Sequence, residues 1–214
     1  MSARRHDNYI LQAWLCITLA LFFGALLAGV QAALGPVIAE NKINETKEKV
    51  PELVFGADAA VDSAGRPALE ITPSTIRTDH AGGTRFYSVF EARFADGTPA
   101  GWVTKASGQG YADRIELLVG LTPDADRISG LYILDQKETP GLGNKIVEVS
   151  WRNQFIRKPT DQPLKVVKRG ARAPEEIDAV SGATISSDSV VAIVNRVVSD
   201  MKTHLAQGPL ENKE

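Results

Sequence analysis

The chain has 214 residues, enough for one ordinary domain and an appendage. Its formal net charge of −2, with cationic and acidic residues spread along the sequence, leaves no basic stripe for a nucleic-acid backbone. The one cysteine, Cys16, excludes an internal disulfide and the set of thiolates that an iron–sulfur cluster needs. An electron carrier built on this chain would therefore need an organic cofactor.

The first predicted element is a membrane-spanning helix. No charged residue occurs between Asp7 and Glu40, and residues 10–30 are almost wholly apolar. About 20 such residues, at a rise of ~1.5 Å each, are enough to cross a bilayer. We predict that residues 1–34 form a cytoplasmic N-terminus and a transmembrane anchor.

Charge next to this helix predicts its orientation. Arg4 and Arg5 precede the apolar run, and positively charged flanks stay in the cytoplasm. The sequence therefore predicts a single-pass protein of the bacterial inner membrane, with its C-terminal domain on the periplasmic side and the lipid bilayer as a partner.

Two other interpretations of the apolar segment are open. Val30-Gln31-Ala32 resembles a signal-peptide cleavage site, although the apolar run exceeds the usual length of about 7–15 residues. The second alternative is that the apolar segment is a core helix of a cytosolic protein. A helix of this length that is apolar on all sides would need a much larger soluble domain to enclose it.

Residues 35–84 are predicted to be a membrane-proximal helix and a linker region. Charges of both signs at helical spacing over 40–50 predict a solvated helix. Residues 55–65 are rich in Ala, Asp, Ser and Gly, which is typical of a loop.

A domain over 85–208, followed by a tail over 209–214, completes the predicted organisation. Its first half consists of β-prone runs separated by turn residues, which is typical of an antiparallel meander. The expected strands, including one ahead of the domain boundary, lie near 71–77, 85–94, 101–104, 114–121 and 128–135.

The second half of this domain has a different pattern. Apolar spacing predicts a short helix over 146–156, and residues 164–168 are expected to form a strand. The Ser186-Ser187-Asp188 cluster is typical of a helix N-cap, and apolar residues over 190–201 follow a helical period, with Gly208 as a C-cap. The predicted fold class is α+β, a sheet with helices packed against it.

A first motif precedes this last helix, from Asp178 to Thr184. Ser181, Gly182 and Ala183 are small and allow the backbone to approach a bulky ligand closely. A helix that begins beside Thr184 would favour a phosphate at its N-terminus. The alternative is a well-capped helix after a turn, without a ligand.

A second motif, Glu138-Thr139-Pro140-Gly141-Leu142-Gly143, lies on a predicted loop about forty residues earlier. Proline fixes one φ angle, the glycines permit positive φ, and the leucine gives the loop one apolar tip. Such a loop can clamp a planar ring. The alternative is a tight surface turn, in which Gly and Pro are common.

Together, the two motifs and the N-terminal apolar helix resemble a known family, the covalent FMN-binding subunits of bacterial respiratory complexes. This family includes the G subunit of the Rnf electron transport complex and the C subunit of the sodium-pumping NADH:quinone reductase. The likeness extends to Gly108-Gln-Gly-Tyr111 and covers nearly the whole chain. The compact length favours the first of these two subunits.

The resemblance implies a cofactor and its site residues. A flavin transferase would join the phosphate of FMN to the hydroxyl of Thr184, and Asp178 would help the transferase to recognise or activate the site. The resemblance also places Thr139, Leu142 and Gly143 against the isoalloxazine ring, with Glu138 ordering their loop. Ser181, Gly182 and Ala183 complete the expected cofactor-binding set.

The same resemblance implies an electron-transfer role. The chain would be an electron-carrying subunit of an ion-translocating ferredoxin:NAD oxidoreductase complex and would pass electrons through its covalent FMN. Its partners would be other membrane, flavin and iron–sulfur subunits. A flavinylated subunit of another respiratory or regulatory complex, and a non-enzymatic membrane-tethered binding domain, are alternatives.

Two further possibilities concern catalysis and metals. Ser199-Asp-Met-Lys202 spells the S-x-x-K motif of serine acyl-enzymes, but it lies near the C-terminus, where the order of motifs is wrong. The three histidines have no short metal-ligand spacing, so we expect no metal site.

Overall fold

The computed structural model describes residues 9–55, 69–80 and 83–206, and these divide into two compact units at Glu45 and Thr46. The predicted loop over 55–65 lies almost wholly outside the described residues. The first unit contains the part of helix α1 (Tyr9–Phe55) that ends at Glu45. Its stretch Leu11–Ile38 has a mean hydropathy of 2.3 and is exposed, as expected of a helix that meets lipid rather than a protein core.

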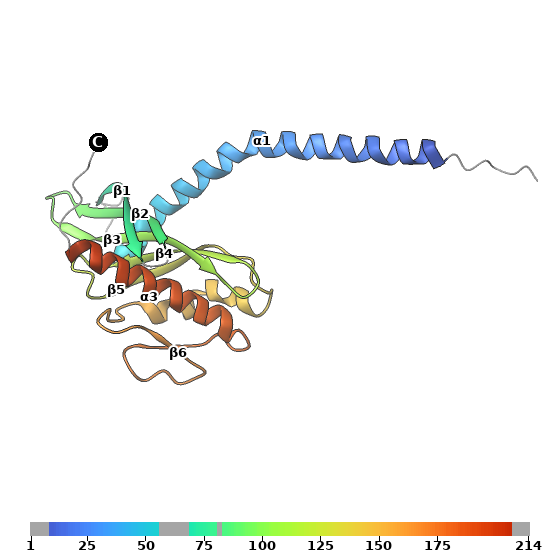
Figure 1. The fold of residues 1–214 in the computed structure, drawn as a ribbon. Helices are drawn as coiled ribbons and strands as arrows, with labels where there is room; N and C mark the ends of the chain where they lie inside the picture. Colours follow the sequence, from blue (N-terminus) through green and yellow to red (C-terminus); the bar gives the residue numbers. More distant parts are fainter. Residues whose placement is uncertain (1–8, 56–68, 81–82, 207–214) are drawn as a thin grey trace, which may run out of the picture. The chain divides into compact units, whose positions relative to one another are not determined.

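The second unit contains an antiparallel sheet of five strands in the order β1-β2-β3-β4-β5 (Figure 1). Each strand pairs with its neighbour in sequence, which is the predicted meander. The strands are β1 (Leu69–His80), β2 (Gly83–Phe94), β3 (Pro99–Gln109), β4 (Arg114–Leu121) and β5 (Ile128–Asp135). This architecture confirms the predicted α+β fold class. The predicted domain boundary at residue 85 falls inside β2. The predicted division of the chain into domains stays a prediction.

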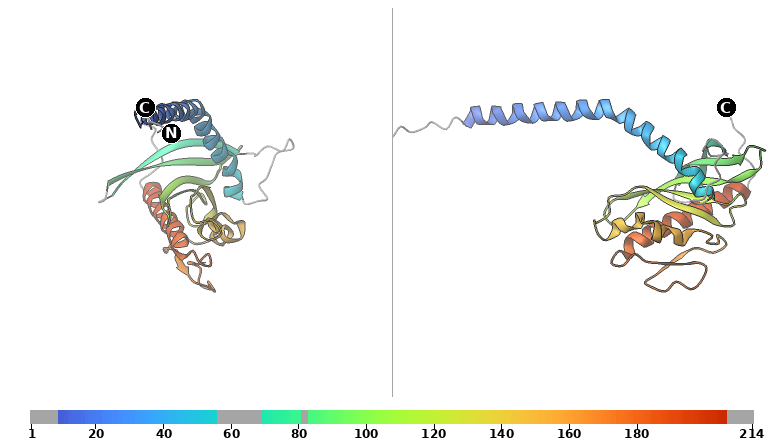
Figure 2. Two further views of the ribbon diagram at one scale, coloured as in Figure 1. Left: turned by 90° about the vertical axis from the view of Figure 1, so that its right-hand side faces the viewer. Right: turned by 180° about the vertical axis from the view of Figure 1, so that it is seen from behind.

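Helix α3 (Thr184–Ala206) packs across one face of this sheet (Figures 1 and 2). Its apolar stripe, which includes Val190, Val194 and Val197, is buried against strand residues such as Leu117 and Val119. Burial of these side chains removes apolar surface from water and supplies most of the free energy that holds helix and sheet together.

A buried polar contact joins the same helix to β2. The hydroxyl of Tyr87 donates a hydrogen bond of 2.7 Å to the buried carboxylate of Asp200. Burial and this hydrogen bond raise the pKa of Tyr87 to about 12. The tyrosine therefore stays protonated and keeps donating over the physiological pH range.

The opposite face of the sheet is covered by the last turns of α1. Val50 and Leu53 are buried there against Phe90, Val103 and Leu118. The predicted helix over 40–50 is present, but it is not a purely solvated one, because its final turns carry a second hydrophobic core.

Glycines allow this close docking. Gly120 and Gly130 are partners on adjacent strands, and a Cβ atom at Gly120 would lie 2.7 Å from the carbonyl oxygen of Leu53. A Cβ atom at Gly130 would lie 2.9 Å from Cδ2 of the same leucine. The sheet therefore has no side chain at the two positions where the backbone of α1 approaches it.

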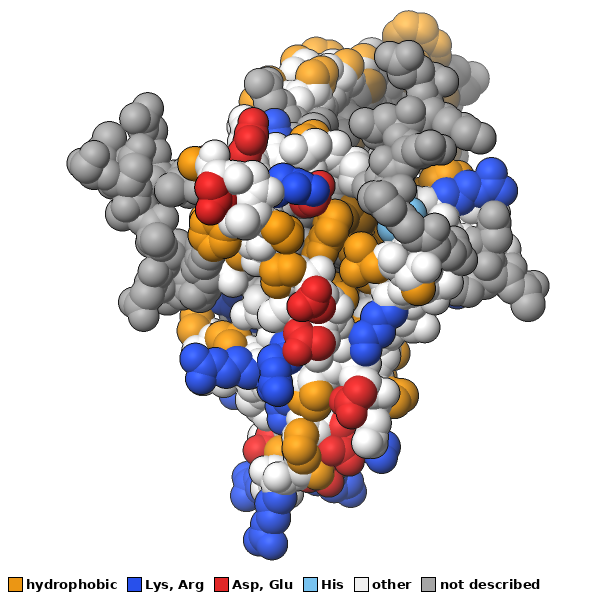
Figure 3. Space-filling view, turned by 90° about the vertical axis from the view of Figure 1, so that its left-hand side faces the viewer, with side chains coloured by type: hydrophobic (Ala, Val, Ile, Leu, Met, Phe, Trp, Pro, Cys, Tyr) orange, Lys and Arg blue, Asp and Glu red, His pale blue; other side chains and the backbone are white. Residues whose placement is uncertain are grey.

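The connection from β5 to α3 contains short elements. These are η1 (Gly143–Val147), α2 (Val149–Arg152), η2 (Asn153–Phe155), β6 (Lys165–Val167) and β7 (Glu176–Asp178), the last two forming a parallel pair. The continuous helix predicted over 146–156 was wrong, because Glu148 is extended and separates η1 from α2. Over the face drawn in Figure 3, acidic, basic and hydrophobic side chains are interspersed.

The glycine pair gives a test of the docking. We expect Gly120→Ala to lower the free energy of unfolding by about 1–3 kcal/mol, because the new methyl group would push the end of α1 from the sheet. Gly35→Ala is the matched control, since a Cβ atom there meets nothing within 4 Å. Urea unfolding of the detergent-solubilised chain measures the free energy of unfolding of both variants. Equal stability of the two variants would contradict the close approach of α1 to the sheet at Gly120.

Candidate functional site

The two predicted motifs lie on one cavity of about 420 Å³. One wall comes from the loop that follows β5, and the other comes from the turn before α3 and the first turn of that helix. Tyr111, from the β3–β4 connection, completes the lining. The lining residues are Tyr111, Thr139, Leu142, Gly143, Gly182, Ala183, Thr184, Ile185 and Ser186.

Thr184 is the first residue of α3, and its side chain is exposed at the cavity. The first amides of an α-helix have no intrahelical acceptor and form the positive end of the helix dipole. A group with negative charge that is held at Thr184 would therefore lie next to these N–H groups. This arrangement suits a phosphate.

Ser187 fixes the place where the helix begins. Its buried hydroxyl accepts a hydrogen bond of 3.0 Å from the N–H of Val180 and donates one of 3.1 Å to the carbonyl oxygen of Ala183. The N–H of Ala183 donates to the carbonyl oxygen of Val180 at 2.9 Å. These bonds close the turn over 180–183 and leave Thr184 at its end.

Glu138 connects the two walls of the cavity through hydrogen bonds. Its carboxylate is buried; Oε2 accepts a hydrogen bond of 2.5 Å from the hydroxyl of Ser186, and Oε1 accepts one of 3.1 Å from the N–H of Ala112. One side chain thus ties its own loop to the first turn of α3 and to the β3–β4 connection. Hydrogen bonds to a charged acceptor are among the stronger ones in proteins.

Gly143 is required for this contact. A Cβ atom at this position would lie 2.6 Å from Oγ of Ser186 and 2.8 Å from Oε2 of Glu138. The loop itself turns tightly, because the N–H groups of Leu142 and Asn144 both donate to the carbonyl oxygen of Thr139, at 3.1 and 3.3 Å. Any larger residue in place of the glycine would separate the two walls.

Apolar side chains border the cavity. Leu142 is 45% exposed and Tyr111 is 62% exposed, although both line the cavity. Leu142 also reaches toward the opposite wall, since a Cβ atom at Gly182 would lie 3.1 Å from its Cδ2. An apolar planar ring would find contact surface between these side chains.

The structure brings together most of the predicted site residues, but not all. Thr139, Leu142, Gly143, Gly182, Ala183 and Thr184 line the cavity, and Glu138 lies directly behind it. Ser181 is exposed in the preceding turn. Asp178 lies on β7, where its carboxylate accepts a hydrogen bond of 2.9 Å from the N–H of Ala171.

Sequence reasoning missed three lining residues. Tyr111 had no assigned role, Ile185 had none, and Ser186 was expected only as an N-cap residue. The structure instead shows Ser186 bonded to a glutamate that lies 48 positions earlier in the sequence. No sequence pattern near Ser186 indicates a hydrogen-bond partner so far away along the chain.

Comparison with known proteins agrees with this geometry. A family model described as an FMN-binding domain matches residues 110–199, which contain the whole lining of the cavity. The G subunit of the ion-translocating oxidoreductase complex of Methanosarcina acetivorans is 34% identical over 173 residues, covering 78% of this chain and 79% of that protein. The chain belongs to the G-subunit family of these complexes.

Other relatives of this G-subunit protein also share its sequence or its fold. The G subunit of the proton-translocating ferredoxin:NAD(+) oxidoreductase complex of Clostridium ljungdahlii is 29% identical, covering 95% of this chain and 97% of that protein. NqrC of Shewanella oneidensis shares the fold with a TM-score of 0.54 and 24% identity, covering 64% of this chain and 70% of that chain. The C subunit of the Na(+)-translocating NADH-quinone reductase from Parabacteroides distasonis has the same TM-score at 22% identity, covering 78% and 94%.

The predicted resemblance is thus confirmed: this G-subunit protein is an oxidoreductase subunit with an FMN-binding domain. Its exposed apolar helix makes it a single-pass membrane-associated protein. The residues present fit FMN, because the cavity joins a helix N-terminus, suited to phosphate, to apolar side chains, suited to a ring.

The serine acyl-enzyme alternative has no support in this geometry. Ser199 is exposed on the far part of α3, and the amine of Lys202 donates a hydrogen bond of 2.6 Å to the carbonyl oxygen of Thr160. The lysine is therefore engaged elsewhere and does not activate the serine as a base.

The role of Glu138 can be tested through stability. Glu138→Ala removes the acceptor of the Ala112 N–H and of the Ser186 hydroxyl, and we expect the free energy of unfolding to fall by about 1–3 kcal/mol. Thr139→Ala, in the same loop but with an exposed side chain, is expected to change it by less than about 0.5 kcal/mol. Urea unfolding followed by circular dichroism would compare them, and equal stabilities would show that the carboxylate does not hold the site.

Proposed function

We propose that this chain is the electron-carrying flavoprotein subunit of an ion-translocating ferredoxin:NAD oxidoreductase complex, with FMN joined to Thr184 by a phosphoester. The observation that supports this most strongly is the shared cavity, in which an exposed threonine hydroxyl at a helix N-terminus faces the loop over 138–143. The family and the names of the relatives support the complex.

The proposed attachment follows from the position of Thr184. As the ester forms, Oγ1 would bond to phosphorus while the phosphoanhydride bond of a flavin dinucleotide breaks. The other half of the dinucleotide would leave as a nucleoside monophosphate, and the hydroxyl proton would pass to solvent. A flavin transferase supplies this chemistry. Because the ester cannot dissociate, the cofactor is retained outside the cytoplasm, where a weakly held flavin would be lost by dilution.

Each remaining residue has a role in this proposal. Ser181, Gly182 and Ala183 keep the backbone beside Thr184 compact, and Asp178 forms part of the surface that the transferase recognises. Thr139, Leu142 and Gly143 lie against the ring, in a loop that Glu138 orders.

Bound FMN supplies reversible electron transfer, and the protein's task is to hold and shield it. Leu142 and Tyr111 exclude water from the ring, and the first turn of α3 stabilises the phosphate charge. Electrons would arrive from membrane-embedded partners and leave to another flavin subunit, so the chain itself turns over no diffusing substrate.

The proposed location is the inner membrane, with the helix retained and residues 46–206 on the periplasmic side. Arg4 and Arg5 ahead of the helix support this orientation.

The attachment can be tested by intact-mass spectrometry of the chain made with and without a flavin transferase. We expect an added mass of FMN less one water only with the transferase. Thr184→Ala should abolish it, and Thr184→Ser, which keeps a hydroxyl, should retain part of it. Thr203→Ala, at the exposed far end of the same helix, is the matched control and should be fully modified. An unmodified wild-type chain in the competent host would disprove the ester.

The orientation can be tested in a Cys16→Ala chain that carries Asp124→Cys on an exposed turn. A membrane-impermeant maleimide should label this cysteine in intact cells. A cysteine placed at Ser2, which precedes the helix, should react only after lysis. The reverse labelling pattern would place the domain in the cytoplasm.

A further inference from the structure

A second cavity, of about 390 Å³, lies where β2 and β3 diverge. Pairing between these strands ends at Ser88 and Lys105, although β2 begins at Gly83 and β3 continues to Gln109. Arg196 of α3 also lines this fork. The two cavities share no lining residue, so this one is separate from the Thr184 site.

Positive charge dominates the lining of the fork. Arg85, Lys105, Arg114 and Arg196 come from β2, β3, β4 and α3, whereas Glu116 is the one carboxylate among the lining residues. Glu116 lies 3.8 Å from Nζ of Lys105 and 3.9 Å from Nε of Arg114, so a single acidic group faces two cations at ion-pair distance. Arg85 lies 3.8 Å from the buried carboxylate of Asp200, which is outside the lining. The four cations therefore face two carboxylates, and the fork keeps a surplus of two positive charges.

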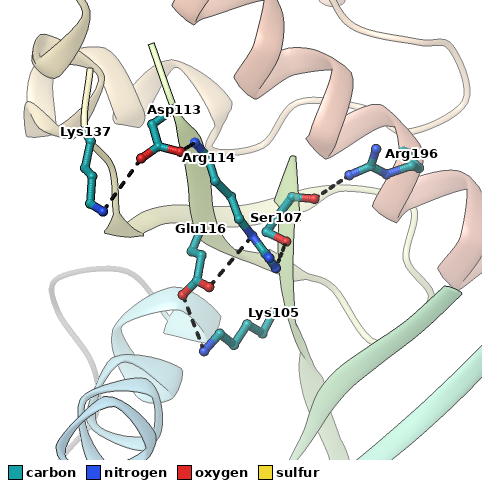
Figure 4. Close-up of polar contacts among 7 residues, drawn as sticks. All are labelled: Lys105, Ser107, Asp113, Arg114, Glu116, Lys137 and Arg196. Carbon is teal, nitrogen blue, oxygen red and sulfur yellow. Dashed lines mark hydrogen bonds and ion pairs between the residues drawn. The ribbon is translucent and has the colours of Figure 1, made fainter. Parts of the chain in front are cut away.

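Two of the guanidinium groups are held in place by the strand between them. Figure 4 shows Arg114 and Arg196 reaching Ser107 from different elements. Arg114 donates to the side-chain hydroxyl, and Arg196 donates to the backbone carbonyl oxygen at 2.7 Å. These contacts fix the guanidinium groups at the edge of β3 and reduce the entropy lost when they bind a ligand.

The arginine on α3 retains unused hydrogen-bonding capacity. Its Nε atom is buried and has no hydrogen-bond partner in the described part of the chain. A buried donor without an acceptor is costly, and such a group is commonly satisfied by a ligand or water.

We propose that this fork binds a phosphate group. Guanidinium groups match the oxygens of phosphate in a bidentate manner, and three of them converge here with a lysine. A phosphate dianion matches the surplus of two positive charges, whereas a ligand with one carboxylate would neutralise half of it. Ala106 and the exposed ring of Phe86 provide apolar surface for an organic substituent on the phosphate.

The phosphate can come from a soluble ion or from the headgroup of an anionic phospholipid, and calorimetric titration of the full chain in detergent separates the two sources. The probes are inorganic phosphate and a short-chain, monomeric phosphatidylglycerol. Binding of inorganic phosphate indicates a soluble ligand, whereas binding of the lipid alone indicates a headgroup site.

Charge variants show whether either probe occupies the fork. Arg114→Gln and, from the neighbouring strand, Lys105→Gln should each weaken binding about tenfold, the loss typical of one charge-assisted hydrogen bond. Glu116→Gln removes the one carboxylate of the lining and should strengthen binding. Lys137→Gln is the matched control, because this lysine is 74% exposed, lies outside the fork and pairs with Asp113 (Figure 4).

Arg114 is 65% exposed, so its replacement should leave the fold intact, which thermal unfolding checks. The proposal is overturned if neither probe binds, if Lys137→Gln weakens binding as much as Arg114→Gln, or if Glu116→Gln weakens it.

Discussion

The buried carboxylate of Glu138 is the constraint on which the site depends. Its two oxygens hold the Ser186 hydroxyl at 2.5 Å and the Ala112 N–H at 3.1 Å, and so join three segments that are distant in sequence. A buried carboxylate is stable only when such donors satisfy it. Because Gly143 leaves room for this contact, the loop lies against the first turn of α3, and Thr184 lines the same cavity as Leu142.

The sheet positions this site through the helix that packs on one of its faces. One face carries α3 and therefore the end of the helix at which Thr184 lies, while the other face receives the last turns of α1 at Gly120 and Gly130. Hydrophobic burial on both faces makes the second unit rigid around its centre. The proposed flavin site lies between the loop after β5 and the start of α3, whereas the fork lies where β2 and β3 diverge.

Much of this arrangement was predictable from local patterns, and the rest was not. Strands over 85–94 and 114–121 agree with the structure because runs of β-prone residues bounded by turn residues mark them directly. The helix predicted over 146–156 failed, since Trp151 is drawn into the core and donates to the carbonyl oxygen of Asp178, which favours short segments over one straight helix. The composition of the two motifs indicated a ligand, but the hydrogen bond that joins them spans 48 positions, and no rule of propensity or periodicity reaches that far.

The hydroxyl of Thr184 is the proposed site of flavin attachment, and several serines lie close to it in the sequence. The most direct measurement is therefore tandem mass spectrometry of the tryptic peptide over 173–196, from protein made with the transferase. This peptide contains Thr184 together with Ser181, Ser186, Ser187 and Ser189. If Thr184 carries the flavin, fragment ions will place the FMN mass on the threonine. Fragment ions that place it on a serine, or a peptide without the added mass, would contradict this attachment.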